Sequence, residues 1–379
     1  MTVTTLKQAQ ACFFYCSFLI RGAARLPRYL GLITVLVLTA ACDGAAPDKV
    51  GASAATAQEA LREVSGPIMG TQYSVKWTGE FFTDAKRVIH TELERINSLM
   101  STYDPSSELS RFNQSPVGEW FEISPETLAT MKVAREVNQA SGGALDVTVG
   151  ALVNLWGFGP EGRVTHEPSQ ADIDKARERS GFDKLELDLE RSRIRKTSDI
   201  YVDLSAVAKG YAVDKVAELL ESKGISDYLV DIGGELRMSG HKPDGSQWRI
   251  AIEAPKIEIR EIFKIFSFDK AAIATSGDYR NYFEQDGVRY SHTIDPRSGR
   301  PIQHALVSVS IVSDQSAVAD AWATALMAVG PETAKTLSQS HNLAVLLIMM
   351  GSKGFETWTS PRLEALQSEQ PVEPAADQR

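Results

Sequence analysis

The segment Val318–Gly330 reads VADAWATALMAVG and has the composition of a buried helix. Alanine, the strongest helix former, dominates it, and the glycine at its end is a typical stop signal. Two polar residues interrupt the apolar pattern, and because Asp320 and Thr324 are four positions apart they share one helix face. The spacing alone leaves two interpretations. Either the pair supplies oxygen ligands to a metal ion, or Thr324 bonds to a helix carbonyl while Asp320 caps the helix.

The composition of the chain restricts the classes of ligand. Its 379 residues are 43% hydrophobic and 23% charged, as in an ordinary globular protein, and carry a net charge of −9. Such a surface repels nucleic acid, so no nucleic-acid partner is expected, and an anionic ligand would need local cations or a metal. The sequence has no HExxH motif and no Cys/His spacing typical of zinc, which leaves a hard, oxygen-bound metal such as Mg²⁺.

The N-terminal residues 1–41 differ from the rest of the chain. They contain four basic residues and no acidic one, and end in the apolar run YLGLITVLVLTAA just before Cys42. This pattern predicts a secretory signal, since the 13-residue run is shorter than the ~20 residues of a membrane-spanning helix. The alanines before Cys42 resemble a bacterial lipobox, which predicts a lipidated, palmitate-bearing cysteine. An uncleaved anchor and a plain signal peptide are the alternatives.

The remaining chain divides by composition into a tether, a domain and a tail. Residues 42–62 are small and polar, which predicts a flexible tether, and residues 361–379 predict a disordered tail. Asp43, directly after the cysteine, resembles the signal that retains lipoproteins in the inner membrane, facing the periplasm. Residues 63–360 form the predicted folded domain.

Hydrophobic periodicity within that domain predicts an α+β fold with largely antiparallel sheets and packed helices. Helices are expected from about residue 83 to 100, 125 to 141, 169 to 181 and 205 to 224. Single strands are expected at 64–77, 228–240, 247–255, 289–295, 305–313 and 342–350. A letter-by-letter GxGxxG match at Gly157–Gly162 is rejected as a dinucleotide site, because Pro160 and a following turn replace the required helix.

Polar groups gather at element boundaries, where functional side chains usually lie. Asp203 is expected at a helix start, where it is either a ligand-binding carboxylate or a cap. Lys209, taken alone, is typical of a solvated surface lysine. His292 precedes an Asp-Pro turn and is a candidate proton shuttle or a structural histidine.

Eight blocks occur in a fixed order along the chain: Met69-Gly-Thr, MSTYDPSSELSRFN, GALDVTVGALVNLWGFGP, DLSAVAKGYAVD, VDIGGEL, ATSGDYRNYF, SHTIDPRSGRPI and ADAWATAL. Together they closely resemble the ApbE family of FAD:protein FMN transferases, long labelled thiamine-biosynthesis lipoproteins. The likeness spans roughly residues 65–350 and implies the ApbE-like (T-fold-like) form of the α+β class.

The resemblance implies a substrate, a metal and a set of site residues. Family members bind FAD and Mg²⁺, transfer FMN to a Thr or Ser of a target protein through a phosphoester, and release AMP. The metal would be held by Asp320, Thr324 and the backbone carbonyl of Ala206. His292 is the implied general base, with Asp203 as a competitor. The implied FAD-binding residues are Met69, Tyr103, Ala144, Leu145, Asp146, Asp203, Lys209 and Ile294.

The chemistry agrees with this ligand set, because a metal on the diphosphate neutralises charge on the transferred and leaving groups. We therefore expect a lipid-anchored enzyme that flavinylates membrane electron-transfer proteins, such as an NADH:quinone reductase subunit. Two alternatives are a Mg²⁺-dependent FAD pyrophosphatase that yields FMN and AMP, and a non-catalytic flavin-binding lipoprotein.

Overall fold

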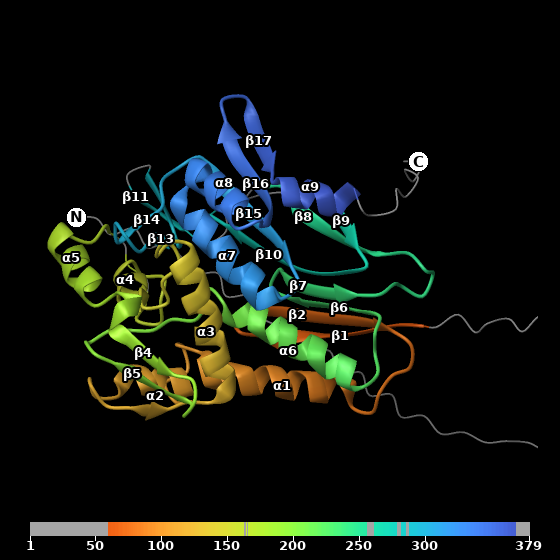
Figure 1. The fold of residues 1–379 in the computed structure, drawn as a ribbon, viewed down its shortest axis with the longest axis horizontal. Coiled ribbons are helices and arrows are strands. Elements are labelled where there is room, and N and C mark those ends of the chain that lie inside the picture. The colour runs from red at the N-terminus through yellow and green to blue at the C-terminus, as the bar shows by residue number, and fades with distance from the viewer. Residues whose placement is uncertain are drawn as a thin grey trace, which may run out of the picture. The chain divides into compact units, whose positions relative to one another are not determined.

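A large antiparallel sheet runs through the described part of the chain (Figure 1). The computed structural model describes residues 60–162, 164, 166–255, 261–278, 282–285 and 288–368, all within one compact unit, residues 56–379. The sheet has eight strands in the order β1 Leu61–Ile68, β2 Thr71–Thr78, β6 Tyr228–Ile232, β7 Glu235–Ser239, β10 Lys270–Gly277, β15 Leu306–Ser313, β16 Ala344–Gly351 and β17 Gly354–Thr359. Each neighbouring pair is antiparallel, as the fold class predicts.

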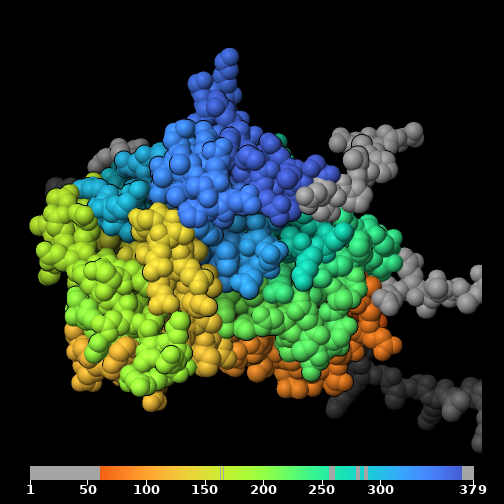
Figure 2. Space-filling model, in the orientation of Figure 1, coloured from red at the N-terminus to blue at the C-terminus, as the bar shows by residue number. Residues whose placement is uncertain are grey.

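One face of this sheet is covered by helices. The helices before residue 341 are α1 Ala85–Met100, α2 Glu108–Gln114, α3 Pro125–Ala140, α4 Gly150–Leu155, α5 Gln170–Glu178, α6 Ala208–Ser222, α7 Ser316–Val329 and α8 Pro331–Ser340, of which α4 and α5 pack in a separate cluster. Apolar side chains of α1, α3, α6 and α7 share one core with β2, β6 and β15, since alternate strand residues point to the same face. In the space-filling view α3 and α7 lie side by side, in the yellow and blue parts of the scale (Figure 2).

The opposite face carries a separate small layer. There the two-stranded pair β8 Trp248–Glu253 and β9 Ile262–Phe268 packs with helix α9 Pro361–Ser368 against β7, β10 and β16. Shorter strands complete the described part: β3 Phe121–Glu122, β4 Leu185–Asp188, β5 Arg193–Lys196, β11 Tyr282–Gln285, β12 Val288–Ser291, β13 Ile294–Asp295 and β14 Arg300–Pro301. The sheet is thus the middle of three layers.

Helix α7 is the buried helix that its sequence predicts. Of its 14 residues, 11 are buried. Its alanines allow the helix axis to approach β10, β15 and α6 closely, and it contacts all three. The helices expected near residues 83, 125, 169 and 205 are also present, as α1, α3, α5 and α6, although α6 begins three residues later than expected.

Two of the predicted single strands are hairpins instead. Residues 64–77 turn at Met69-Gly70 and residues 228–240 turn at Gly233-Gly234. All four turn residues have positive φ, between 47° and 105°, as two-residue hairpin loops of type I′ require. Met69 is the exception in residue type, because its Cβ makes the left-handed conformation unfavourable by about 1–2 kcal/mol.

The predicted ends of the domain need correction. Residues 361–368 form α9, and Leu363 is fully buried, so the prediction of a disordered tail from residue 361 is wrong for this segment. Residues 61 and 62 already belong to β1 rather than to a tether. The predicted signal peptide, most of the tether, Cys42 and Asp43 lie outside the described residues. Among the helices of the described part, none combines the length and apolarity that a membrane span demands.

Candidate active site

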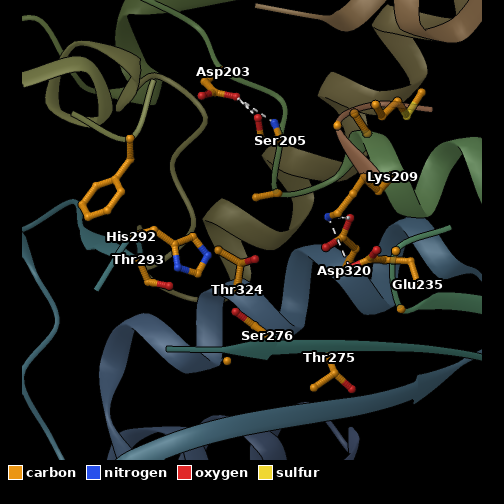
Figure 3. A pocket seen from close by; sticks show the side chains of 18 of the residues that line it. Asp203, Ser205, Lys209, Glu235, Thr275, Ser276, His292, Thr293, Asp320 and Thr324 are labelled. Atoms are coloured by element: carbon orange, nitrogen blue, oxygen red, sulfur yellow. Dashed lines mark hydrogen bonds and ion pairs between the residues drawn. The ribbon is translucent and has the colours of Figure 1, made fainter. Parts of the chain in front are cut away.

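A cavity of about 1120 Å³ opens where α6, α7 and the end of β10 meet the loops after α1 and α3. All twelve site residues predicted within the domain line it: Met69, Tyr103, Ala144, Leu145, Asp146, Asp203, Ala206, Lys209, His292, Ile294, Asp320 and Thr324. They come from six separate stretches of sequence, so the fold alone brings them together. Figure 3 shows Asp203, Lys209, His292, Asp320 and Thr324 around this space.

The predicted metal ligands on α7 are not used to cap that helix. The first backbone N–H groups of α7, at Ser316 and Ala317, are bound by the Asp214 carboxylate at 3.0 and 2.9 Å. Asp320 lies one turn further on, is 5% exposed, and accepts the backbone N–H of Gly210 at 3.1 Å. The capping interpretation of Asp320 is therefore wrong, and its remaining carboxylate capacity faces the cavity.

The backbone carbonyl of Ala206 is available as a third oxygen. In a regular helix the N–H of Gly210 would bond to the carbonyl four residues earlier, which is that of Ala206. Here this N–H is used by Asp320, and no other described backbone N–H bonds to the Ala206 carbonyl. A carboxylate, a hydroxyl and an unpaired carbonyl form the hard-oxygen set that Mg²⁺ prefers, so the residues fit that ion. Within the described residues no cluster of three His, Cys, Asp or Glu offers an alternative metal site.

A partly buried cation lies beside this oxygen set. The Lys209 Nζ is 3.2 Å from Glu235 Oε1 and 3.7 Å from Asp320 Oδ2 (Figure 3). Burial acts to lower the pKa of Lys209, but the two carboxylates outweigh it and leave that pKa above its ordinary value. Lys209 is therefore charged, and it is not the solvated surface lysine that its sequence position alone suggested.

Glu235 is the carboxyl of this cluster that tends to keep its proton. Burial raises the pKa of Glu235 to about 8, because the attraction of Lys209 compensates the lost solvation only in part. Burial likewise raises the pKa of Asp320, against the pull of Lys209 and the Gly210 hydrogen bond. The Oε2 atom of Glu235 is buried and has no partner among the described residues. One ammonium shared by two carboxylates leaves the proton on Glu235 near neutral pH.

Three other predicted residues are held in place by local hydrogen bonds. Asp203 Oδ1 accepts the backbone N–H and the hydroxyl of Ser205 at 2.8 and 2.5 Å. Since α6 begins five residues later, Asp203 is not its cap. Asp146 Oδ1 accepts the N–H and hydroxyl of Thr148 at 2.8 and 2.6 Å, and burial raises the pKa of this carboxyl. Tyr103, 65% exposed at the cavity mouth, donates its hydroxyl to the Phe158 carbonyl at 3.1 Å.

His292 lies in a break between strands rather than on one. The predicted strand 289–295 is interrupted at His292 and Thr293, between β12 and β13. The imidazole packs edge-on to Phe158, with ring centroids 6.4 Å apart. In Figure 3 the ring lies beside Thr324, on the α7 side of the cavity. Because His292 is not part of a strand, its side chain does not have to point to one of the two faces of a sheet, and it lies near the predicted metal ligands.

The profile of the ApbE family matches residues 69–347 of the chain. The protein belongs to the ApbE family. A FAD:protein FMN transferase from Vibrio cholerae is 45% identical over 301 residues, covering 78% of this chain and 90% of that protein. One from Salmonella typhimurium is 40% identical over 319 residues, covering 82% and 90%.

Solved structures of ApbE proteins share the fold. The flavin transferase ApbE from Vibrio cholerae has a TM-score of 0.76 at 42% identity, covering 81% of this chain and 99% of that one. The apo form of the Pseudomonas stutzeri flavinyl transferase ApbE has a TM-score of 0.75 at 38% identity, covering 83% and 98%. The family resemblance and the predicted fold class are confirmed.

Sequence reasoning missed one buried residue of this ApbE site, Glu235. The signal was present in VDIGGEL, where an acidic residue directly follows a two-glycine turn between apolar strand residues. An acidic residue in this position is either exposed at the end of a strand or buried beside a positively charged partner. The sequence does not show which applies, because the partner, Lys209, is brought to Glu235 only by the fold.

Proposed function

We propose that this ApbE-family protein, which the match to its relatives shows to be a FAD:protein FMN transferase, uses Mg²⁺. Its relatives of 45% and 40% identity carry that activity in their names. The observation that carries the proposal is the convergence of Asp320, Thr324 and the unpaired Ala206 carbonyl beside Lys209 in a cavity of about 1120 Å³. That arrangement suits a diphosphate, which an otherwise acidic protein could not bind without a metal and a local cation.

FAD would lie with its diphosphate at this oxygen set and its flavin toward the cavity mouth. Met69 and Tyr103 line that end, and offer a sulfur and an aromatic contact to the isoalloxazine ring. Ala144, Leu145, Asp146 and Ile294 line the remaining wall and would contact the adenosine half.

The reaction transfers the FMN phosphoryl group from AMP to a hydroxyl. The acceptor oxygen bonds to the FMN phosphorus while the bond from that phosphorus to the bridging oxygen breaks, and its electron pair leaves with AMP. When bound, Mg²⁺ supplies Lewis-acid neutralisation of the diphosphate charge. Lys209 adds a fixed positive charge beside Asp320.

The proton of the attacking hydroxyl needs a base near neutral pH. His292 lies on the α7 side of the cavity (Figure 3), and an imidazole is suited to this role, typically contributing ~10²–10⁴-fold. Asp203 is the less suitable base, since its Oδ1 already accepts two hydrogen bonds from Ser205.

We further propose that the acceptor is a Thr or Ser of a membrane electron-transfer protein, such as an NADH:quinone reductase subunit. The lipobox-like sequence at Cys42 and the tether after it support an enzyme anchored by lipid to the inner membrane and facing the periplasm. Mass spectrometry of the N-terminal peptide from membranes tests the anchor. An unmodified Cys42 would contradict it.

The activity itself is tested with residues 43–379, FAD, Mg²⁺ and an acceptor domain from a membrane quinone reductase. The expected result is a gain of one FMN in the intact mass of the acceptor, equimolar AMP, and loss of both in EDTA. AMP without a mass gain, at the same rate without acceptor, would indicate FAD pyrophosphatase activity instead. Intact FAD throughout, with tight binding, would indicate a flavin-binding lipoprotein.

A further inference from the structure

The end of β10 has an open hydrogen-bonding edge inside the cavity. On one side β10 pairs with β15 from Ala272 to Gly277, but on the other it pairs with β7 only from Lys270 to Ile273. Strand β7 does not extend further along β10, because it begins at Glu235, directly after the turn Gly233-Gly234 that connects it to β6. Ala274–Gly277, named here the β10 half-edge, therefore has no strand beside it in the described part of the chain.

The backbone groups of this half-edge point into the open space. The N–H of Asp278 donates to Val307 on the β15 side. Backbone groups alternate sides along an antiparallel strand, so the N–H and C=O groups of Thr275 and Gly277 face the opposite side. No described residue bonds to these groups. Thr275, Ser276 and Gly277 all line the cavity, which fits a strand that presents its edge, since a strand face would present alternate residues only.

Glycines line the space along the half-edge. Gly277 on the half-edge and Gly233 and Gly234 at the end of β7 all line the cavity. Glycines in or beside strands commonly mark a place where another backbone comes close. An extended segment entering here would continue the line of β7 and pair with β10.

The half-edge also leads to the reacting groups. Strand β10 packs against α7, which carries the predicted ligands Asp320 and Thr324. Figure 3 shows Ser276 on β10 beside Thr324, with His292 on the other side of that residue. A backbone paired with this half-edge would therefore hold a side-chain hydroxyl near the predicted base and metal.

We propose that the acceptor protein docks by adding an extended segment, with its Thr or Ser, as a strand along the β10 half-edge. Main-chain pairing of this kind provides affinity largely independent of sequence, and it fixes which side chains point to the reacting groups. The inference rests on the proposed transferase function and adds to it the site and conformation of the protein substrate.

The test scans an acceptor peptide by N-methylation against the unaltered enzyme. The probe is a 15-residue peptide around the modified residue of the quinone reductase domain, with one backbone N–H methylated at a time. A paired strand predicts a fall of at least tenfold in kcat/KM at every second residue, with little change at the residues between. Equal effects at neighbouring positions, or an effect only at the modified residue, would overturn the proposal.

A pair of enzyme variants checks the same edge. Gly277→Val places a branched side chain on the half-edge and should raise the acceptor KM at least tenfold, while leaving FAD affinity and acceptor-free AMP release within twofold. Thr357→Val, which places the same branched side chain on the edge strand β17 of the same sheet but outside the cavity, is the matched control and should keep acceptor kinetics near normal. A parallel loss of FAD affinity in Gly277→Val would instead assign this edge to FAD. If the unaltered enzyme never modifies the domain or the peptide, the proposed function itself fails.

Discussion

Gly210→Ala tests whether the contact between α6 and α7 sets the predicted metal site. A Cβ at Gly210 would lie 2.3 Å from the carbonyl oxygen of Ser316 and 2.8 Å from the Cα of Ala317. Both are backbone atoms of the first turn of α7, so no side-chain rotation relieves the overlap. Since ordinary contacts to carbon begin near ~3.5 Å, the two helices would have to separate by roughly 1 Å.

This separation should affect the folding free energy less than it affects the binding of Mg²⁺. Overpacking of this kind typically destabilises by about 1–3 kcal/mol, and alanine regains about 1 kcal/mol of helix propensity over glycine. The net loss of folding free energy is then about 0–2 kcal/mol. The Ala206 carbonyl, in the turn just before α6, would move away from Asp320 on α7, and the 3.1 Å hydrogen bond between Gly210 and Asp320 would stretch. A displacement of ~1 Å at a catalytic centre can reduce activity ~10²-fold.

The assay compares Mg²⁺ dependence with stability in one set of proteins. Mg²⁺ is titrated while AMP release is recorded, and urea unfolding is measured in EDTA. We expect the half-saturating Mg²⁺ concentration to rise 10- to 100-fold. Gly118→Ala is the control, because its φ of +86° makes alanine unfavourable while nothing lies within 4 Å of the added Cβ. It should lose similar stability and keep normal Mg²⁺ dependence. A Gly210→Ala enzyme with unchanged Mg²⁺ dependence would refute the reasoning.

Three further predictions concern single side chains of the site. Asp320→Ala should abolish Mg²⁺-dependent AMP release, whereas Thr324→Ala should only raise the Mg²⁺ requirement, since a neutral ligand is lost rather than a charge; equal losses in the titration would contradict this order. Glu235 has a pKa raised from 4.5 to about 8 in the fold, so its contribution to stability is complete below pH 4.5 and is lost as the pH rises through 8. Urea unfolding in EDTA between pH 5 and 8 should therefore show a smaller decline for Glu235→Gln than for the parent, and identical slopes would count against the raised pKa. Met69→Gly should stabilise the fold by about 1 kcal/mol by removing a left-handed methionine at φ 47°, yet weaken FAD binding measured by flavin fluorescence. An unchanged FAD affinity would exclude the sulfur contact.

The sequence alone could locate the ligands on α7 because helix geometry is regular. Asp320 and Thr324 share a helix face wherever the helix lies in the fold. The Ala206 carbonyl is different, since it becomes available only when the N–H of Gly210 turns to a carboxylate 110 residues away. Glu235 was missed for the same reason, because the position of Lys209 gives it its role.

The strand predictions failed where local patterns were ambiguous. Residues 64–77 contain apolar residues on both sides of the turn, and Met69 at the turn is not a residue that signals positive φ. Strand β10 was not predicted because Ala271, Ala272, Ile273 and Ala274 are all buried, which removes the alternation of a one-sided strand. These residues are buried on both faces of the sheet because β8, β9 and α9 form a third layer. The presence of that layer cannot be predicted from the sequence of β10 itself.

Helices α6 and α7 are bonded to each other in both directions without an ion. Asp214 on α6 accepts two N–H groups from the start of α7, and Asp320 on α7 accepts one from Gly210 on α6. In small zinc domains the metal supplies the folding energy, so that chelation unfolds the chain. Here hydrogen bonds between protein groups hold the geometry of the predicted ligands independently of the proposed Mg²⁺. Protein stripped with EDTA should therefore regain its activity as fast as Mg²⁺ can be mixed in, because no refolding step separates the two states.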